Sequence, residues 1–237
     1  LRNAQSMLNQ SLMRLSSGKR ILRPSDDPGG LAVSMKLQNA LTVTSATKQN
    51  IDNAKSYIDT QDAALSSVGT ILDRMSTLVT SYGSGTANTS DKASYATEFK
   101  ELQAQLFAFK GEKFNSISLF SSQGISRNVY LSSEGSAGAT ISVSTLDLSS
   151  ALSIGTGKNL SAQRYGSNAI SISDASVSIG SITTAINSVA SLRAQSGATS
   201  SRLQFSTDYL STSMLNLEEA RSRIVDVDVA EETTNMA

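Results

Sequence analysis

Residues 37–82 read LQNALTVTSATKQNIDNAKSYIDTQDAALSSVGTILDRMSTLVTSY. In this stretch, side chains seven residues apart are mostly apolar, and the positions three residues further on form a second series. The first series is Leu37, Thr44, Ile51, Ile58, Leu65, Leu72 and Val79, and the second is Ala40, Thr47, Ala54, Gln61, Val68, Met75 and Tyr82. This heptad spacing places both series along one side of an α-helix, where another helix can cover them. Because no Pro interrupts the pattern, it predicts one helix over about 28–82 that needs packing partners.

Two further stretches supply those partners. A C-terminal helix is predicted over 178–222 by another heptad series, which consists of Ile182, Val189, Ser196, Leu203, Leu210 and Leu217. A shorter helix is predicted over 90–110 by apolar side chains at alternating spacings of four and three, namely Tyr95, Phe99, Leu102, Leu106 and Phe109. Thr44, Thr47 and Ser196 interrupt the apolar stripes, and they either allow close helix approach or form a polar network. The three helices can bury one another's stripes, so the sequence predicts a mainly α fold.

The pattern changes between residues 121 and 175. Residues 128–131 and 140–144 are rich in β-formers and flank the sequence EGSAG at 134–138, which predicts a β-hairpin. The apolar residues that follow it, and the segment 170–172, are compatible with a short strand or with a loop. An isolated hairpin is only marginally stable in water, so we expect this region to pack on the helices.

The composition excludes several classes of function. The chain of 237 residues contains no Cys, His or Trp, and its 20 Lys and Arg balance its 20 Asp and Glu. Without Cys and His there is no disulfide framework, thiol nucleophile or Ser-His-Asp triad, and a metal site would need carboxylates alone. Zero net charge argues against general binding of nucleic acid, and no apolar run is long enough to span a membrane. We therefore expect no enzyme, no cofactor and no metal site.

Stretches near both ends resemble the signature regions of bacterial flagellin. The N-terminal stretch is RLSSGKRI at 14–21, followed by Asp26-Asp27 and by GLAVS at 30–34. The C-terminal stretch is ARSRIVDVDVAE at 220–231. Two further segments are also similar to the family, namely Phe114-Asn115 and 191–203. The similarity covers nearly all of the chain outside 121–175, with the motifs in the order of the family.

The resemblance implies a structural subunit that stacks head to tail with its own copies into the flagellar filament used for motility. It implies a rod domain over 28–222, built as a long antiparallel helical bundle with a small β-hairpin region. The segments 1–27 and 223–237 would then be incomplete spoke and inner-core segments, in a chain truncated at both ends. The resemblance further implies secretion through the flagellar channel to the cell surface. Its expected partners are hook-associated proteins and an export chaperone.

Two acidic clusters are the candidate polar sites. Asp26 and Asp27 precede Pro28, which is typical of a helix N-terminus stabilised by its macrodipole, with a metal or acid–base site as the alternative. The second cluster consists of Asp226, Asp228, Glu231 and Glu232, for which a solvated or subunit-contacting face is expected, with a metal site as the alternative. Arg221 and Arg223 lie close by, and we expect them to pair with acids of this cluster. For a filament subunit, the candidates for subunit contact are Asp26, Asp27, Arg221, Arg223, Asp226 and Asp228.

Two alternative functions remain open. The sequence RPSDDP at 23–28 is similar to the hook–filament junction protein of the same superfamily. A cell-surface relative that binds a polysaccharide or another ligand is the second alternative. That function needs an aromatic platform, and Tyr130, Tyr165 and Tyr209 are scattered along the sequence.

The stretch LDRMSTL at 72–78 resembles the flagellin patch that the Toll-like receptor for flagellin recognises. Arg74 matches the central Arg of that patch, and its alternative role is that of a solvated helix residue. Ser76 and Thr77 replace the usual second Arg and the Glu of the patch. Since those charges make the strongest hydrogen bonds, we expect weak or absent binding to this innate immune receptor.

Overall fold

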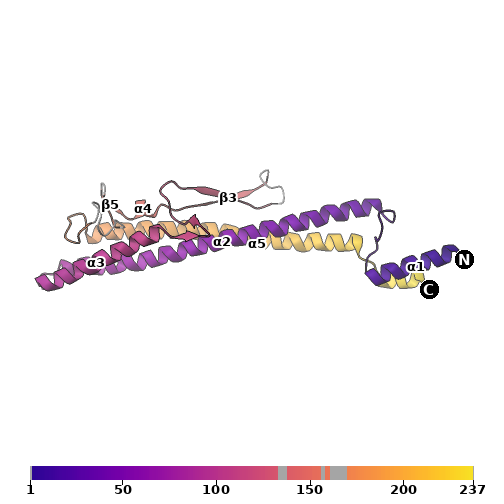
Figure 1. The fold of residues 1–237 in the computed structure, drawn as a ribbon, viewed down its shortest axis with the longest axis horizontal. Coiled ribbons are helices and arrows are strands. Elements are labelled where there is room, and N and C mark those ends of the chain that lie inside the picture. The colour runs from indigo at the N-terminus through magenta and orange to yellow at the C-terminus, as the bar shows by residue number, and fades with distance from the viewer. Residues whose placement is uncertain (1, 133–137, 156–157, 161–169, 237) are drawn as a thin grey trace. The chain divides into compact units, whose positions relative to one another are not determined.

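The computed structural model describes residues 2–132, 138–155, 158–160 and 170–236, which are mainly helical (Figure 1). The elements are α1 (Arg2–Ser17), α2 (Pro28–Tyr82), α3 (Thr89–Lys110), β1 (Lys113–Phe114), β2 (Ile117–Ser118), β3 (Ser126–Tyr130), β4 (Thr140–Ser144), α4 (Leu148–Ala151), β5 (Ser153–Gly155), β6 (Lys158–Asn159), α5 (Ile179–Val225) and α6 (Val229–Met236). The long helix that the heptad pattern predicts over 28–82 is α2, and the two helices predicted as its partners are α3 and α5. The prediction of a mainly α fold with a small β region is confirmed.

Contacts divide the chain into two compact units. Unit 1 comprises residues 1–51, 130–139 and 205–237, and unit 2 comprises 52–129 and 140–204. Helices α2 and α5 contribute a segment to each unit.

The segments of α2 and α5 in unit 2 are antiparallel. The Lys55 ammonium of α2 donates to the Gln204 side chain of α5 at 2.6 Å. Two turns further along α2, Asp62 pairs with Arg193 at 2.9 Å, so residue numbers fall on α5 as they rise on α2. In unit 1, the Gln38 side chain of α2 bonds Arg221 of α5. The predicted antiparallel packing of these helices is therefore present in unit 2.

The core of unit 2 forms where the apolar stripes of α2, α3 and α5 pack against one another. The side chains that are at most 2% exposed include Ile58, Leu65, Val68, Leu72 and Met75 of α2, Phe99 and Leu106 of α3, and Ile182, Val189 and Leu203 of α5. Each such side chain contributes about 1.5–3 kcal/mol by leaving water. Near the end of α2 the buried position is Leu78 instead of the predicted Val79. Val79 is only partly buried, so the seven-residue series does not continue to the end of the helix.

In unit 2, polar side chains interrupt the apolar stripes where Gln61 of α2 contacts Ser196 of α5. Gln61 is 2% exposed, and its amide nitrogen donates to the Leu119 carbonyl at 2.7 Å. The Ser196 hydroxyl of α5 donates to the Gln61 amide oxygen at 3.3 Å. For Ser196, the structure therefore supports the polar network over close helix approach alone. In unit 1, Thr47 instead donates to the Val43 carbonyl of its own helix.

Among its described residues, the β region contains three short strand pairs. The predicted hairpin is present as β3 and β4, and part of its predicted turn, 133–137, lies outside the described residues. In β1 and β2, Asn115 and Ser116 form the turn with φ of 47° and 64°, a left-handed conformation that suits a tight hairpin. The short strand considered at 170–172 is absent, because these residues form no ladder; Ile170 and Ile172 are buried instead.

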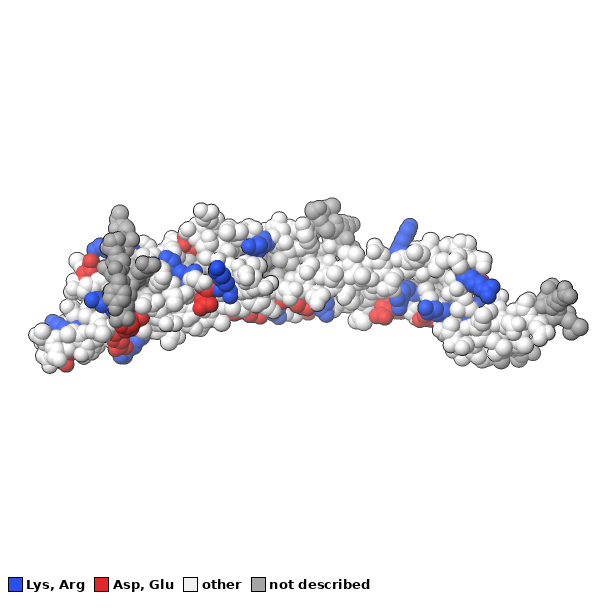
Figure 2. Space-filling view, in the orientation of Figure 1, with Lys and Arg blue, Asp and Glu red and all other residues white. Residues whose placement is uncertain are grey.

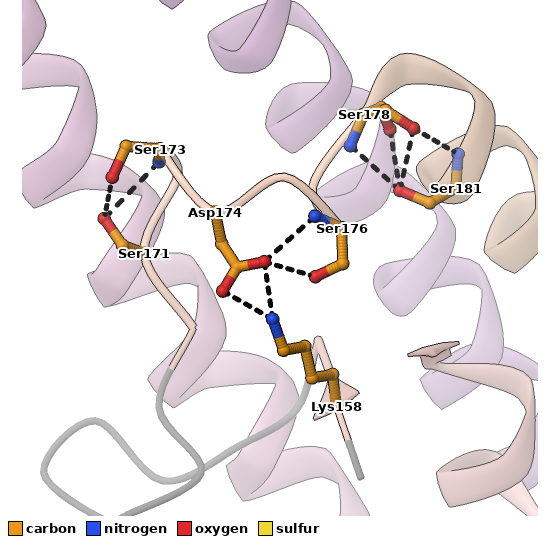
Figure 3. A network of polar contacts seen from close by, with 7 residues as sticks. All are labelled: Lys158, Ser171, Ser173, Asp174, Ser176, Ser178 and Ser181. Carbon is orange, nitrogen blue, oxygen red and sulfur yellow. Dashed lines mark hydrogen bonds and ion pairs between the residues drawn. The ribbon is translucent and has the colours of Figure 1, made fainter. Parts of the chain in front are cut away.

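A small polar network holds the segment that leads into α5 (Figure 3). The Lys158 ammonium donates to both Asp174 carboxylate oxygens at 2.7 Å. The backbone N–H and hydroxyl of Ser176 donate to the same carboxylate at 2.9 and 2.6 Å. These bonds, that from Lys158 foremost, hold the pKa of Asp174 well below its usual range. At the first turn of α5, the Ser178 hydroxyl accepts from the Ser181 N–H at 3.1 Å and acts as the cap.

Replacing Gln103 by Leu should stabilise the protein. Gln103 is fully buried on α3, and neither atom of its amide has a hydrogen-bond partner among the described residues. Because a buried unpaired polar group costs about 1–3 kcal/mol, Gln103→Leu should raise the free energy of unfolding by about that amount in urea titrations. The control Gln105→Leu, at an exposed position of the same helix, should change it by less than about 0.5 kcal/mol. Equal effects of the two substitutions would contradict the expectation.

Candidate functional site

The two sequence motifs at the ends of the chain meet in unit 1. We call residues 18–27 and 222–228 the terminal junction. The Arg20 N–H donates to the Val225 carbonyl at 2.6 Å, and the Val227 N–H donates to the Gly18 carbonyl at 3.1 Å. Gly18 has a φ of +68°, a conformation that favours glycine and that turns the chain out of α1. The linker after α1 is therefore bonded directly to the segment between α5 and α6.

Arg20 is the central side chain of the terminal junction. Its Nε and Nη2 atoms donate to the Ile224 carbonyl at 3.1 and 2.8 Å, which satisfies a free carbonyl at the end of α5. Its positive charge also complements the negative end of that helix dipole. The same guanidinium lies 3.9 Å from the Asp27 carboxylate. Arg20 thus links the end of α5 to the start of α2.

Asp27 caps α2, in agreement with the role expected for a helix N-terminus. Its carboxylate accepts from the Gly30 N–H at 2.8 Å. A Cβ atom on residue 30 would lie 2.3 Å from this carboxylate, and therefore only glycine fits there without a shift. The acid and the glycine of the motif are thus required by the same turn.

Asp26 holds the linker itself. Its carboxylate accepts from the backbone N–H groups of Leu22 and Arg23 at 3.0 and 2.9 Å. These bonds, that from Arg23 first and then that from Leu22, lower the pKa of Asp26 because they stabilise the charged form. Ionised Asp26 therefore stabilises the linker turn more than protonated Asp26 does.

The second acidic cluster also shapes the backbone. Asp226 accepts from the Ser222 hydroxyl at 2.5 Å, one turn back along α5. Asp228 accepts from the Ala230 N–H at 2.9 Å, so it caps α6. Within the described residues, no group of three or more acidic side chains is placed to hold a metal ion.

The two arginines do not pair with these acids, which corrects the expectation from the sequence. Arg223 lies one turn from Glu219 on α5 and pairs with it at 2.5 Å. Arg221 bonds the Gln38 side chain of α2. Asp226 instead accepts from the Ser222 hydroxyl, and Asp228 lies beyond the end of α5 at Val225, where it caps α6.

Helices α1 and α6 lie side by side beyond the junction (Figure 1). Glu232 of α6 is 7% exposed and lies 3.7 Å from Arg14 of α1. Several apolar side chains of α1 remain exposed in this arrangement, between 42% and 69%, and these are Met7, Leu8, Leu12 and Met13. A row of exposed apolar side chains on one helix is typical of a protein–protein contact.

Three other residues singled out in the sequence lie outside the junction. Arg74 on α2 forms a two-bond ion pair with Glu98 of α3, at 2.6 and 2.9 Å. The pair raises the pKa of Arg74 and lowers that of Glu98. Tyr130 and Tyr209 are exposed on β3 and α5, while Tyr165 lies outside the described residues.

The charge on the visible surface is mixed. On the face shown in Figure 2, basic and acidic side chains are interspersed and most of the surface is uncharged. This distribution agrees with the formal net charge of zero. In the described residues, no helix is both long and apolar enough to cross a membrane.

Comparison with known proteins identifies the family of these junction motifs. Residues 1–124 match the bacterial flagellin N-terminal helical region, and residues 179–237 match the bacterial flagellin C-terminal helical region. The chain belongs to the flagellin family. It is a structural subunit of the bacterial flagellar filament, as the sequence resemblance predicted.

Relatives of this flagellin cover nearly its whole length. It is 32% identical to the flagellin of Halalkalibacterium halodurans, over 98% of this chain and 83% of that protein. It is 29% identical to the flagellin of Bacillus subtilis, over 98% of this chain and 84% of that protein.

Solved structures show the same fold. The crystal structure of Bacillus cereus flagellin is similar with a TM-score of 0.56 and 27% identity, over 68% of this chain and 88% of that chain. A putative flagellar hook-associated protein from Vibrio parahaemolyticus shares the fold with a TM-score of 0.70 and 19% identity, over 85% of this chain and 100% of that chain.

Several residues of the junction carried no separate signal in the sequence of this flagellin. Arg20 lies inside the quoted N-terminal motif, but its target is the backbone carbonyl of Ile224 near the other end of the chain, which no local pattern reveals. The burial of Glu232 likewise depends on α1. Only the caps, Asp27 and Asp228, follow from local chemistry, because an acid at the first turn of a helix is a local signal.

The linker should loosen in acid. A lowered folded-state pKa means that Asp26 contributes stability fully above its ordinary value of 3.8, and that this contribution is lost as the pH falls through the lower folded value. Protection factors of the Leu22 and Arg23 amides should therefore drop in acid, while Asp26→Asn should lower them at neutral pH and flatten the profile. Asp52→Asn, on an exposed position of α2, is the control. An unchanged acid profile in the Asp26 variant would refute this role.

Proposed function

We propose that this flagellin assembles head to tail with copies of itself, and that the terminal junction sets how the α1–α6 pair leaves the ends of α2 and α5. The observation that carries the proposal is the direct bonding of the two end motifs, through Arg20 and the backbone at Gly18 and Val227. A contact between two different surfaces of the same subunit does not close on itself and therefore builds a helical filament. The exposed apolar side chains of α1 supply one surface that a neighbour can cover.

This proposal assigns a role to each segment of the chain. Residues 1–27 and 223–237 form the spoke and inner-core side of the subunit, and 28–222 form its bundle. The candidates for subunit contact divide in the same way. Asp26, Asp27, Asp226 and Asp228 act mainly by shaping the junction, while Arg221 and Arg223 present charge on α5.

The proposal includes a route and partners. The protein is secreted through the flagellar channel with the help of an export chaperone, and it meets hook-associated proteins at the ends of the filament. We infer no catalytic activity, because the chain has neither Cys nor His and the described residues gather no acidic metal site. The support for the flagellar partners is membership of the family.

Assembly can be tested through the junction. The wild-type protein should form filaments under polymerising conditions, seen by electron microscopy and by pelleting. Arg20→Ala should reduce pelleting several-fold, because the loss of its charged hydrogen bonds frees the end of α5. Lys36→Ala, which removes the same charge from an exposed site of α2, should assemble normally. Absence of wild-type filaments, or equal loss in both variants, would overturn the proposal.

We further propose weak recognition by the Toll-like receptor for flagellin. Arg74 is already engaged by Glu98 within the subunit, and its guanidinium would have to exchange this partner for the receptor. Ser76 and Thr77 carry no charge with which to compensate. Both features reduce the charged hydrogen bonds that this patch can offer to a receptor.

Restoring the two charges should restore signalling. Since a hydrogen bond to a charged group is worth about 1.5–3 kcal/mol, Ser76→Arg with Thr77→Glu should increase reporter-cell activation by about tenfold or more. The matched control places the same two substitutions at Ser66 and Ser67, which are exposed elsewhere on α2. Strong activation by the wild-type protein at low concentration would contradict the proposal.

A further inference from the structure

A preformed apolar groove lies in unit 2, outside the terminal junction. It has a volume of about 340 Å³ and lies between α2 and the strand pairs β1–β2 and β3–β4. Its apolar walls include Tyr57, Phe114, Ile117 and Val129, and Arg127 lies at the same groove. The rings of Tyr57 and Phe114 meet edge to face, with centroids 6.1 Å apart. A further aromatic ring could extend this arrangement, since aromatic rings favour such edge contacts.

The walls of the groove are fixed before any partner arrives. The Tyr57 hydroxyl donates to the Ser118 carbonyl at 2.9 Å, so its polar end is satisfied and its ring is left for apolar contact. The β1–β2 turn at Asn115 and Ser116 brings Phe114 and Ile117 opposite each other in the ladder. A partner that enters the groove therefore does not have to order it, which lowers the cost of binding.

Unit 1 carries two exposed aromatic side chains on α5. Phe205 and Tyr209 on α5 are 75% and 69% exposed. Four residues apart on a helix, they lie on the same side and form a single projecting patch. Aromatic side chains bury about 150–250 Å² each when covered, and Tyr is frequent among the residues that dominate binding energy. Asp208, next to Tyr209, places a negative charge beside the patch.

We propose that Phe205 and Tyr209 of one subunit dock in the groove at Tyr57 and Phe114 of a neighbouring subunit. The inference rests on the proposed self-assembly, which brings copies of this chain into contact. The groove and the aromatic pair are apolar surfaces of matching kind on one chain, and the charges agree, because Arg127 at the groove would face Asp208 beside the pair. Two different patches make a contact that does not close, as filament growth requires.

Engineered cysteines test the contact directly, because the natural chain has none. Thr212→Cys, one turn from Tyr209, and Asn53→Cys, at the groove on α2, leave the proposed contact residues in place. The two proteins, prepared separately and assembled together under mild oxidation, should yield a disulfide-linked dimer of the two chains in the filament. Mixing the Asn53→Cys protein with Thr184→Cys, an exposed position elsewhere on α5, should give little product. Filaments without the first cross-link, or with equal amounts of both, would overturn the inference while leaving the proposed function intact.

A second experiment measures the energetic weight of the aromatic pair. The variant with both Phe205→Ser and Tyr209→Ser should raise the critical concentration for assembly by at least about tenfold. The circular dichroism of its monomer should be unchanged, since both side chains are exposed. The control Leu215→Ser, at a position of α5 that is 68% exposed, should stay within about twofold of wild type. An unchanged critical concentration in the double variant refutes the inference, and a wild-type protein that forms no filaments refutes the proposed function as well.

Discussion

The structure depends on one physical constraint, which is that α2 cannot keep its apolar stripe in water. A helix of 55 residues with such a stripe folds only where other helices cover it. In unit 2 that cover comes from α3 and α5, and the side chains at the contact are almost completely buried. The composition supports this solution. Small Ser, Thr and Ala side chains fill the rest of the helical surface, so each helix needs only a narrow stripe of contact.

Backbone groups, more than side-chain pairs, hold the ends of the chain together in unit 1. A helix end leaves carbonyl and N–H groups unsatisfied, and the junction assigns a partner to several of them. Arg20 donates to the Ile224 carbonyl, Asp27 accepts from an N–H of α2, and Asp228 accepts from an N–H of α6. Arg20 therefore completes the end of α5 from the other end of the chain, whereas Asp27 and Asp228 each cap the helix that directly follows them.

The sequence predicts those parts of the fold that repeat with the period of a helix. The heptad series found α2 and α5, since a buried stripe recurs with every turn, and the acid before Pro28 indicated the start of α2. The burial of Leu78, one residue before the last member of the heptad series, was not predicted by this pattern. Contacts between distant segments were beyond reach. The bond from Arg20 to the Ile224 carbonyl, and the burial of Gln103 without a partner among the described residues, depend on which segment packs opposite them.

The protein combines exposed apolar side chains with a formal net charge of zero. A soluble monomer usually avoids association by carrying net charge and by keeping apolar patches small. Here the formal net charge is zero, and Met7 on α1 and Phe205 on α5 are each more than two-thirds exposed. Neither long-range repulsion nor a polar cover opposes contact between copies. The zero net charge therefore favours the proposed contacts between copies, which bring apolar surfaces together without net repulsion.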